Sequence, residues 1–152
     1  MTSSVDAIKQ LREETSCGVI ECKKALEESK GDFQIAKEIL RKRGLEMAAK
    51  KSDRVAKEGR VESYIHNGNK IGVVVEVNCE TDFVARNDDF SKFTRELAMH
   101  IAAMNPADAQ SLLIQPFVKD PSKSIQDLLN ELVAKIGENI QIGRFVRFKI
   151  GE

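Results

Sequence analysis

The stretch VVVEVNCETDFVARNDDF, from Val73 to Phe90, decides how the second half of the chain folds. Its run of valines is typical of a strand that is buried on most sides, and this strand ends at Asn78. Asp82 and Phe83 follow, and charged residues take over after them. From the physics of the residues alone, we expect Phe83 to fold back over the sheet edge. A phenylalanine held outward beside an acid would instead form a rigid, charged wedge for a partner.

Two further segments complete a sheet with this strand. The segment RVESYIH at 60–66 alternates, so that three of its residues share one face: Val61, Ser63 and Ile65. The turn sequence Asn67-Gly68-Asn69 joins it to KIGVVVEVN at 70–78, because Asn and Gly tolerate positive φ. The last segment, NIQIGRFVRFKI at 139–150, also alternates, and Gly143 predicts a bulge or bend in it. An antiparallel sheet of about three strands results.

Helical patterns fill the rest of the second half. Either Asp88 or Asp89 is expected to cap a long helix, which the Asn105-Pro106 pair ends. A short helix is predicted over Ala109 to Ile114, within an otherwise irregular region that reaches Lys123. Ser124 is expected to cap a further helix, whose apolar residues point inward: Ile125, Leu128, Leu129, Leu132, Val133 and Ile136. The predicted fold class is therefore α+β, with helices on one face of the sheet.

The first 44 residues predict a small module of three short helices. Ser16 is expected to cap the second helix, and Lys30-Gly31 ends it. Asp32 is expected to cap the third helix, which Gly44 ends. On this basis we divide the chain into residues 1–44 as a partner-binding module, 45–59 as a connector helix that Gly59 ends, and 60–152 as an α+β core and dimerisation domain.

Composition excludes several classes of protein. Apolar residues make up 41% of the 152 residues, which supports a folded core, and 24 basic residues balance 24 acidic ones. We therefore expect no membrane partner, and no nucleic-acid partner from charge alone. The polar N-terminus and the odd number of cysteines, Cys17, Cys22 and Cys79, favour a soluble chain in a reducing cytoplasm.

Catalytic and metal-binding patterns are not found in the sequence. The cysteines lack the paired spacing of a zinc site, so no metal or other cofactor is expected. His66 and His100 have no nucleophile in a known arrangement nearby, and we interpret both as structural. No glycine-rich phosphate loop opens a helix. We therefore expect a protein that is not an enzyme and that has no catalytic residues.

The second predicted helix offers one candidate contact for a partner. Adjacent residues on a helix point about 100° apart, so Val19 and Ile20 cannot both face the core. Val19 continues the apolar stripe formed by Cys22, Ala25 and Leu26, and this leaves Ile20 exposed. A single exposed isoleucine is ordinary in a folded protein and is weak evidence by itself.

Three motifs resemble the elongation factor Ts family. They are Val75–Asn87 (VEVNCETDFVARN), Leu11–Thr15 (LREET) followed by Gly18 and Cys22–Leu26 (CKKAL), and Ala134–Ile140 (AKIGENI). They occur in the family's order and extend over nearly the whole chain. The resemblance implies a guanine-nucleotide exchange factor for elongation factor Tu, with an N-terminal module like ubiquitin-associated domains, and it implies that Phe83 reaches outward.

The resemblance also implies roles for particular residues. Four residues of the module are expected to pack on the GTPase domain of elongation factor Tu: Arg12, Val19, Ile20 and Lys23, with Val and Ile where some members carry Met. Four residues are expected to intrude beside the partner's magnesium site: Thr81, Asp82, Phe83 and Val84. Ile136 and Gly137 match a loop that approaches the partner's phosphate-binding region.

The chain departs from the longer family members, which carry two related core halves and a coiled-coil insertion. It resembles the short forms, so we expect a homodimer in which a second copy covers an apolar face or edge of the sheet. Two alternatives stay open at this point. One is an adaptor with a ubiquitin-associated-like module, and the other is RNA binding through the basic stretch from Arg41 to Lys57.

Overall fold

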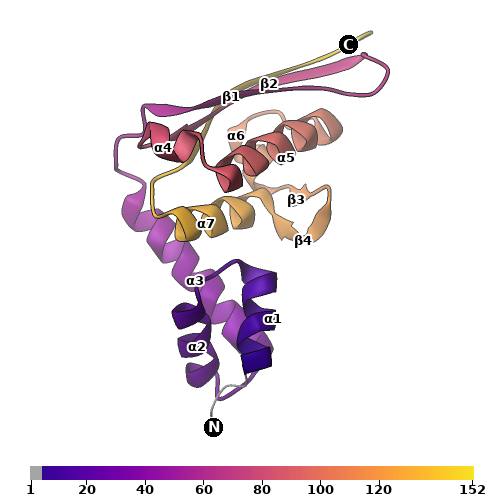
Figure 1. The fold of residues 1–152 in the computed structure, drawn as a ribbon. Helices are drawn as coiled ribbons and strands as arrows, with labels where there is room; N and C mark the ends of the chain where they lie inside the picture. The colour runs from indigo at the N-terminus through magenta and orange to yellow at the C-terminus, as the bar shows by residue number, and fades with distance from the viewer. Residues whose placement is uncertain (1–4) are drawn as a thin grey trace.

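The computed structural model describes residues 5–152 and has two parts (Figure 1). The first part consists of helices α1 (Val5–Thr15), α2 (Val19–Glu28) and α3 (Phe33–Lys51). Asp32 caps α3 as predicted, since its side chain accepts a hydrogen bond from the Ile35 backbone at 2.9 Å. The buried residues between the helices are Leu11, Cys22, Ala25, Leu26, Ala36 and Leu40. Residues 1–4 of the predicted module lie outside the described residues.

The junction between α1 and α2 differs from the prediction. Ser16 has a φ of 59°, and its backbone N–H donates to the Arg12 carbonyl at 2.8 Å. It therefore belongs to the end of α1, and the predicted Ser16 cap of α2 is wrong. Gly18 occupies the N-cap position of α2 in extended conformation. The next junction agrees with the prediction, because Lys30 and Gly31 both have positive φ after the end of α2.

Helix α3 continues through Gly44, so the predicted stop at this glycine is wrong. Gly44 is buried, and a Cβ added to it would lie 3.8 Å from the backbone carbonyl of Asn130 in α7 (Ile125–Ile136). This distance is ordinary van der Waals contact, so a small side chain would also fit between the two helices. The predicted connector helix is the second half of α3, and it ends at Lys51 instead of Gly59. The division at residues 44 and 59 stays a prediction, and α3 crosses its first boundary.

The second part is built on a three-stranded antiparallel sheet of order β1-β2-β5. Strand β1 (Glu58–Ile65) contains Gly59, whose φ of 148° and close approach to the Val77 carbonyl exclude a side chain. The predicted hairpin joins it to β2 (Ile71–Cys79). Strand β5 (Gln141–Lys149) pairs with β2 with a register shift between Val75 and Val77, opposite Gly143. The predicted bulge is therefore confirmed.

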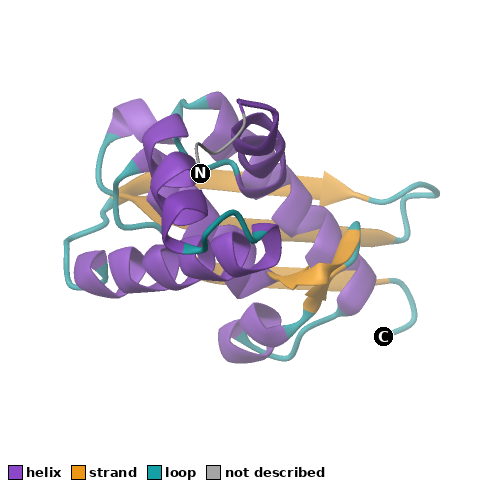
Figure 2. Cartoon of the chain, turned by 90° about the horizontal axis from the view of Figure 1, so that it is seen from below, coloured by secondary structure: helices purple, strands orange, loops and turns teal. Residues whose placement is uncertain are grey.

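Helices cover one face of this sheet (Figures 1 and 2). They are α4 (Asp82–Ala85), α5 (Asp88–Met104), α6 (Ala109–Ile114) and α7. Ser124 caps α7, as predicted, and forms a capping box with Asp127. Asn87 caps α5, because its side chain accepts from the backbone of Asp89 and Phe90, so the predicted cap at Asp88 or Asp89 is wrong. A two-stranded sheet, β3 (Pro116–Phe117) and β4 (Asp120–Ser124), was not predicted.

The two faces of the main sheet differ in burial. Val73, Val75 and Val77 point into the core beneath the helices and are buried, whereas Val74 points to the other face and is exposed. The predicted burial of β2 on most sides is therefore wrong, although the α+β class is confirmed. The other face carries a group of exposed apolar residues, which we call the open sheet face: Val61, Ile65, Val74, Val146, Phe148 and Ile150.

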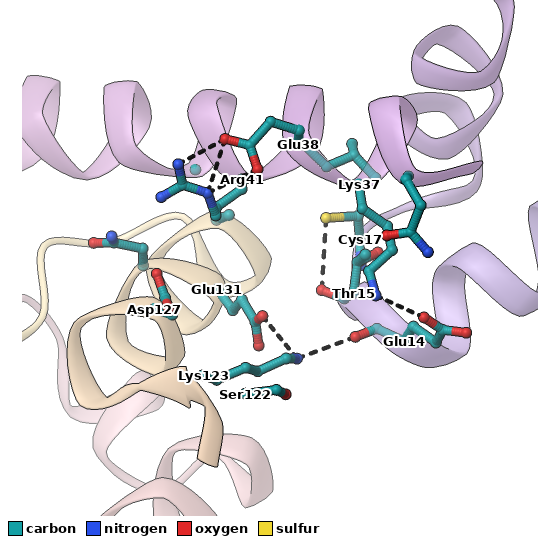
Figure 3. Close-up of a pocket in the computed structure, with 15 residues that line it drawn as sticks. Glu14, Thr15, Cys17, Lys37, Glu38, Arg41, Ser122, Lys123, Asp127 and Glu131 are labelled. Carbon is teal, nitrogen blue, oxygen red and sulfur yellow. Dashed lines mark hydrogen bonds and ion pairs between the residues drawn. The ribbon is translucent and has the colours of Figure 1, made fainter. Parts of the chain in front are cut away.

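The three-helix module is attached to the core through α3 and α7 (Figure 3). Lys123 bridges the two parts, because its ammonium pairs with Glu131 at 2.8 Å and donates to the backbone carbonyl of Glu14 at 3.1 Å. Burial raises the pKa of Glu131 despite the lysine. A cleft of about 250 Å³ lies at this junction, and its walls carry charges of both signs.

Candidate functional site

The α4 turn, residues 80–86, follows directly from the central strand. Thr81 caps the four-residue helix α4, in which Ala85 is buried and Val84 packs against the core. One helical turn that directs these two residues inward directs Phe83 outward, and the Phe83 side chain is 84% exposed. The expectation from residue physics that Phe83 covers the sheet edge is therefore wrong. The outward position implied by the family resemblance is confirmed.

The acidic neighbour of Phe83 is also exposed. Asp82 forms an ion pair with Arg86, which lies one turn further along the chain and is itself exposed. An exposed pair of this kind contributes little to the stability of the fold. The α4 turn thus presents an aromatic ring beside a carboxylate and a guanidinium.

Glu138 fastens the α4 turn to the segment after α7. One carboxylate oxygen of Glu138 accepts hydrogen bonds from the backbone N–H groups of Glu80 and Thr81, both at 3.0 Å. The other oxygen accepts from the Thr81 hydroxyl at 2.7 Å. The family resemblance implied roles only for Ile136 and Gly137 in this segment. Glu138 lies in the same AKIGENI motif, which was the available signal for it.

The end of α7 lies against the end of α3. Gly137 ends α7 with a φ of 87°, and its carbonyl accepts a hydrogen bond from the Lys51 ammonium at 2.7 Å. Ile136 is partly buried and packs against the core. The structure therefore brings the predicted residues Ile136 and Gly137 next to the α4 turn, with Glu138 as the connection.

The predicted residues of the module form a separate surface, which we call the module surface: Arg12, Val19, Ile20 and Lys23. All four are exposed, with Ile20 at 68% and Val19 at 49%. The predicted burial of Val19 is wrong, because it is the first residue of α2 and only the following stripe of Cys22, Ala25 and Leu26 is covered. Figure 1 shows α1 and α2 at one end of α3 and the α4 turn near the other.

The buried titratable side chains His100 and Cys79 lie in the core, in surroundings that indicate a structural role. His100 is buried, its Nδ1 accepts from the Val118 backbone at 3.2 Å, and its Nε2 faces the Gln115 side chain at 2.9 Å. Burial lowers the pKa of His100 and raises the pKa of the Cys79 thiol to about 11. Among residues 5–152, no group of three potential metal ligands was found. No helix in the same range is both long and apolar enough to span a membrane.

Comparisons with known proteins identify the family of this chain. The family model described as Elongation factor TS matches residues 80–152, which include the α4 turn and Glu138. The Elongation factor Ts of Thermoanaerobacter sp. (strain X514) is 45% identical, over 98% of this chain and 95% of the relative. That alignment runs over 194 residues, so it includes stretches of the relative with no counterpart in this 152-residue chain. The Elongation factor Ts of Herpetosiphon aurantiacus is 42% identical, over 99% of both chains.

Proposed function

The chain belongs to the elongation factor Ts family, and from that premise we propose that it promotes the release of GDP from elongation factor Tu. Membership makes it a translation elongation factor with elongation factor Tu as its partner. In the proposed mechanism the α4 turn disturbs the magnesium and phosphate site of the partner, after which GTP can bind. The chain supplies no catalysis of its own, acts in the cytoplasm and makes no direct contact with nucleic acid.

The exposure of Phe83 is the observation that carries this proposal. A phenylalanine that is 84% exposed contributes little to the fold of its own chain. The start of its turn is nevertheless fixed, because Thr81 caps α4 and Glu138 in turn accepts a hydrogen bond from the Thr81 hydroxyl. An apolar side chain on a backbone that is already ordered loses less conformational entropy on binding and is a favourable anchor at an interface.

The physical effect on the partner follows from the coordination of magnesium. Mg²⁺ requires nearly ideal octahedral geometry, so a ring wedged among the groups that organise the ion would weaken its binding. Without the ion, the charge of the nucleotide phosphates is less well neutralised. Because linkage is reciprocal, nucleotide and exchange factor weaken each other's binding by the same factor. A coupling of ~4 kcal/mol corresponds to roughly a thousandfold weaker nucleotide binding.

Release of a fluorescent GDP analogue from elongation factor Tu, in millimolar magnesium, tests this function. The wild-type chain is expected to accelerate release, and Phe83→Ala is expected to reduce the acceleration at least about thirtyfold, as for the loss of a hot spot of about 2 kcal/mol. Ile114→Ala is the matched control. Ile114 is also an exposed apolar residue in the second part of the chain, but it lies in α6, outside the α4 turn. Equal rates for wild type and Phe83→Ala would contradict the proposal.

We further propose that the open sheet face joins two copies of the chain. Its residues form rows across the strands, since Gly72 pairs with Ile65 on one side and with Phe148 on the other. Val74 likewise pairs with Val146. An apolar face of this kind on a soluble domain is typical of an interface, and a twofold axis lets the same face cover itself.

The mass in solution tests the dimer. Wild-type chain is expected at twice the 17.0 kDa of one copy, and Phe148→Glu at the mass of one copy, because two charges would be buried in the interface. Ile114→Glu is the control, since it adds the same charge to an exposed apolar position away from this face. A wild-type mass of one copy at all concentrations would contradict the dimer.

The basic stretch from Arg41 to Lys57 offers fewer free cations for RNA than its sequence suggests, because several of them are engaged within the chain. Arg41 pairs with Glu38, and Arg43 contacts both Glu21 and Glu28. Lys51 donates to Gly137, and Arg54 pairs with Glu80 at 3.5 Å. RNA affinity that falls steeply with salt would be the result in favour of that alternative.

A further inference from the structure

We propose that Glu138 is a positioning residue that fixes the orientation of the α4 turn, and through it the direction in which Phe83 projects. The inference rests on the proposed function, because it assigns to Glu138 a role in presenting Phe83 to the partner. Glu138 itself is partly buried and belongs to the segment that follows α7.

The geometry supports a role in orientation, because Glu138 contacts the chain immediately before Phe83 at three points. Two are backbone N–H groups, at Glu80 and Thr81, and the third is the Thr81 hydroxyl. The same hydroxyl oxygen accepts the Val84 N–H at 3.4 Å and so caps α4. One carboxylate therefore determines where the chain leaves β2 and how the α4 turn begins.

Hydrogen bonds run in both directions between the α4 turn and the segment after α7, so each segment holds the other in place. The Glu80 carboxylate accepts the Asn139 N–H at 2.7 Å, while Glu138 accepts the N–H of Glu80. Asn139 is buried, and its side-chain amide donates to the Arg54 carbonyl at 2.6 Å. The α4 turn, the segment after α7 and the segment after α3 are thus joined in one network.

A carboxylate suits this position because all of its neighbours in the contact are donors. An ionised carboxylate has only acceptors and can take all three hydrogen bonds on its two oxygens. Alanine would leave the two N–H groups and the hydroxyl without this partner, so the start of α4 would lose its fixed orientation. Phe83 would then present the same ring in a wider range of directions.

The test compares Glu138→Ala with Glu96→Ala, which removes a carboxylate of α5 that has an ion pair of 3.8 Å with Lys119. Release of the fluorescent GDP analogue is measured over a range of exchange-factor concentrations. Glu138→Ala is expected to lower the maximal release rate about tenfold, and the half-saturating concentration is expected to stay within about threefold of wild type, because the module surface is intact. Glu96→Ala is expected to change neither value.

A double-mutant cycle separates positioning from general stability. If Glu138 acts through Phe83, Glu138→Ala is expected to change the residual rate of Phe83→Ala by less than about twofold. Loss of the full tenfold in both backgrounds would overturn the proposal. Thr81→Val is expected to resemble Glu138→Ala, and Thr81→Ser, which keeps the hydroxyl, is expected to restore the rate.

Hydrogen exchange of the free chain distinguishes failure of this inference from failure of the proposed function. The N–H groups of Glu80 and Thr81 are expected to exchange faster in Glu138→Ala than in Glu96→Ala, and this readout does not require elongation factor Tu. Unchanged protection of both groups would overturn the positioning role. Faster exchange, combined with no acceleration of GDP release by wild-type chain, would overturn the proposed function and leave the orienting contact intact.

Discussion

Phe83 and Phe90 lie seven residues apart in one continuous stretch, yet their surroundings are opposite. Phe90 is fully buried in the first turn of α5, while Phe83 is 84% exposed in α4. The two rings have the same size and the same hydrophobicity, so neither property decides burial here. What differs is the local backbone: α4 directs Val84 and Ala85 inward, and α5 directs Phe90 inward.

This difference separates two uses of an aromatic side chain. The Phe90 ring contributes to the free energy of unfolding, because burial removes it from water. The exposed Phe83 ring makes little such contribution in the isolated chain, and under the proposed function its burial would instead occur against elongation factor Tu. The comparison predicts that substitutions in α5 affect stability and that the substitution in α4 affects nucleotide exchange.

The largest expected effect on stability is that of Phe90→Ala. Removing a fully buried phenylalanine leaves a cavity between α5 and the sheet and is expected to lower the free energy of unfolding by about 3–5 kcal/mol. Urea denaturation followed by circular dichroism measures it. A loss below about 1 kcal/mol would show that the core around α5 is not packed as described.

A smaller effect is expected at the cap between the two helices. Asn87→Ala removes the side chain that accepts from the Asp89 and Phe90 backbone, and should cost about 1 kcal/mol. Asp88→Ala is the control, since Asp88 lies inside α5. If Asp88→Ala were the more destabilising of the two, the cap predicted from the sequence would be the correct one.

Phe83→Ala is expected to have a still smaller effect on stability. Because the ring is 84% exposed, the change in the free energy of unfolding should stay within about 0.5 kcal/mol, while GDP release is strongly reduced. The same denaturation experiment measures the first value. A loss comparable to that of Phe90→Ala would remove the distinction between the two phenylalanines.

The smallest effect at neutral pH concerns His100, and it becomes measurable only in acid. Burial lowers the pKa of His100 below its ordinary value of 6.5. Between the lowered and the ordinary pKa, the unfolded chain binds a proton that the folded chain does not bind, so stability falls as pH decreases below about 6.5. Denaturation at a series of pH values should show this slope in wild type. The slope should be reduced in His100→Gln, and an equal slope in both would exclude His100 as its origin.

The sequence predicted much of the fold because its signals were local. The hairpin turn, the Asp32 and Ser124 caps and the bulge at Gly143 each depend on a few neighbouring residues. Gly44 was misinterpreted as a helix end because α3 continues past it along α7, which lies more than 80 residues away in the chain. Burial of Val74 was overestimated because a run of valines does not reveal that only one face of the sheet is covered.

The candidate site followed mainly from the family resemblance. Residue physics alone placed Phe83 on the sheet edge, since hydrophobicity gives no information about a partner. Glu138 lies 58 residues from Glu80 and 57 residues from Thr81 in the chain, so no local sequence pattern predicts these contacts. The exposure of Val19 likewise depends on where α2 begins, since Val19 is its first residue.

Helix α3 connects the part of the chain that carries the module surface to the part that carries the α4 turn. Its 19 residues rise about 28 Å, and each residue turns the chain by about 100°. Inserting one residue in α3 would rotate the module surface by about 100° relative to Phe83. Inserting seven residues would nearly restore the original orientation but would lengthen the helix by about 10 Å. Under the proposed function, the length of α3 would therefore set both the spacing and the angle between the two surfaces that contact elongation factor Tu.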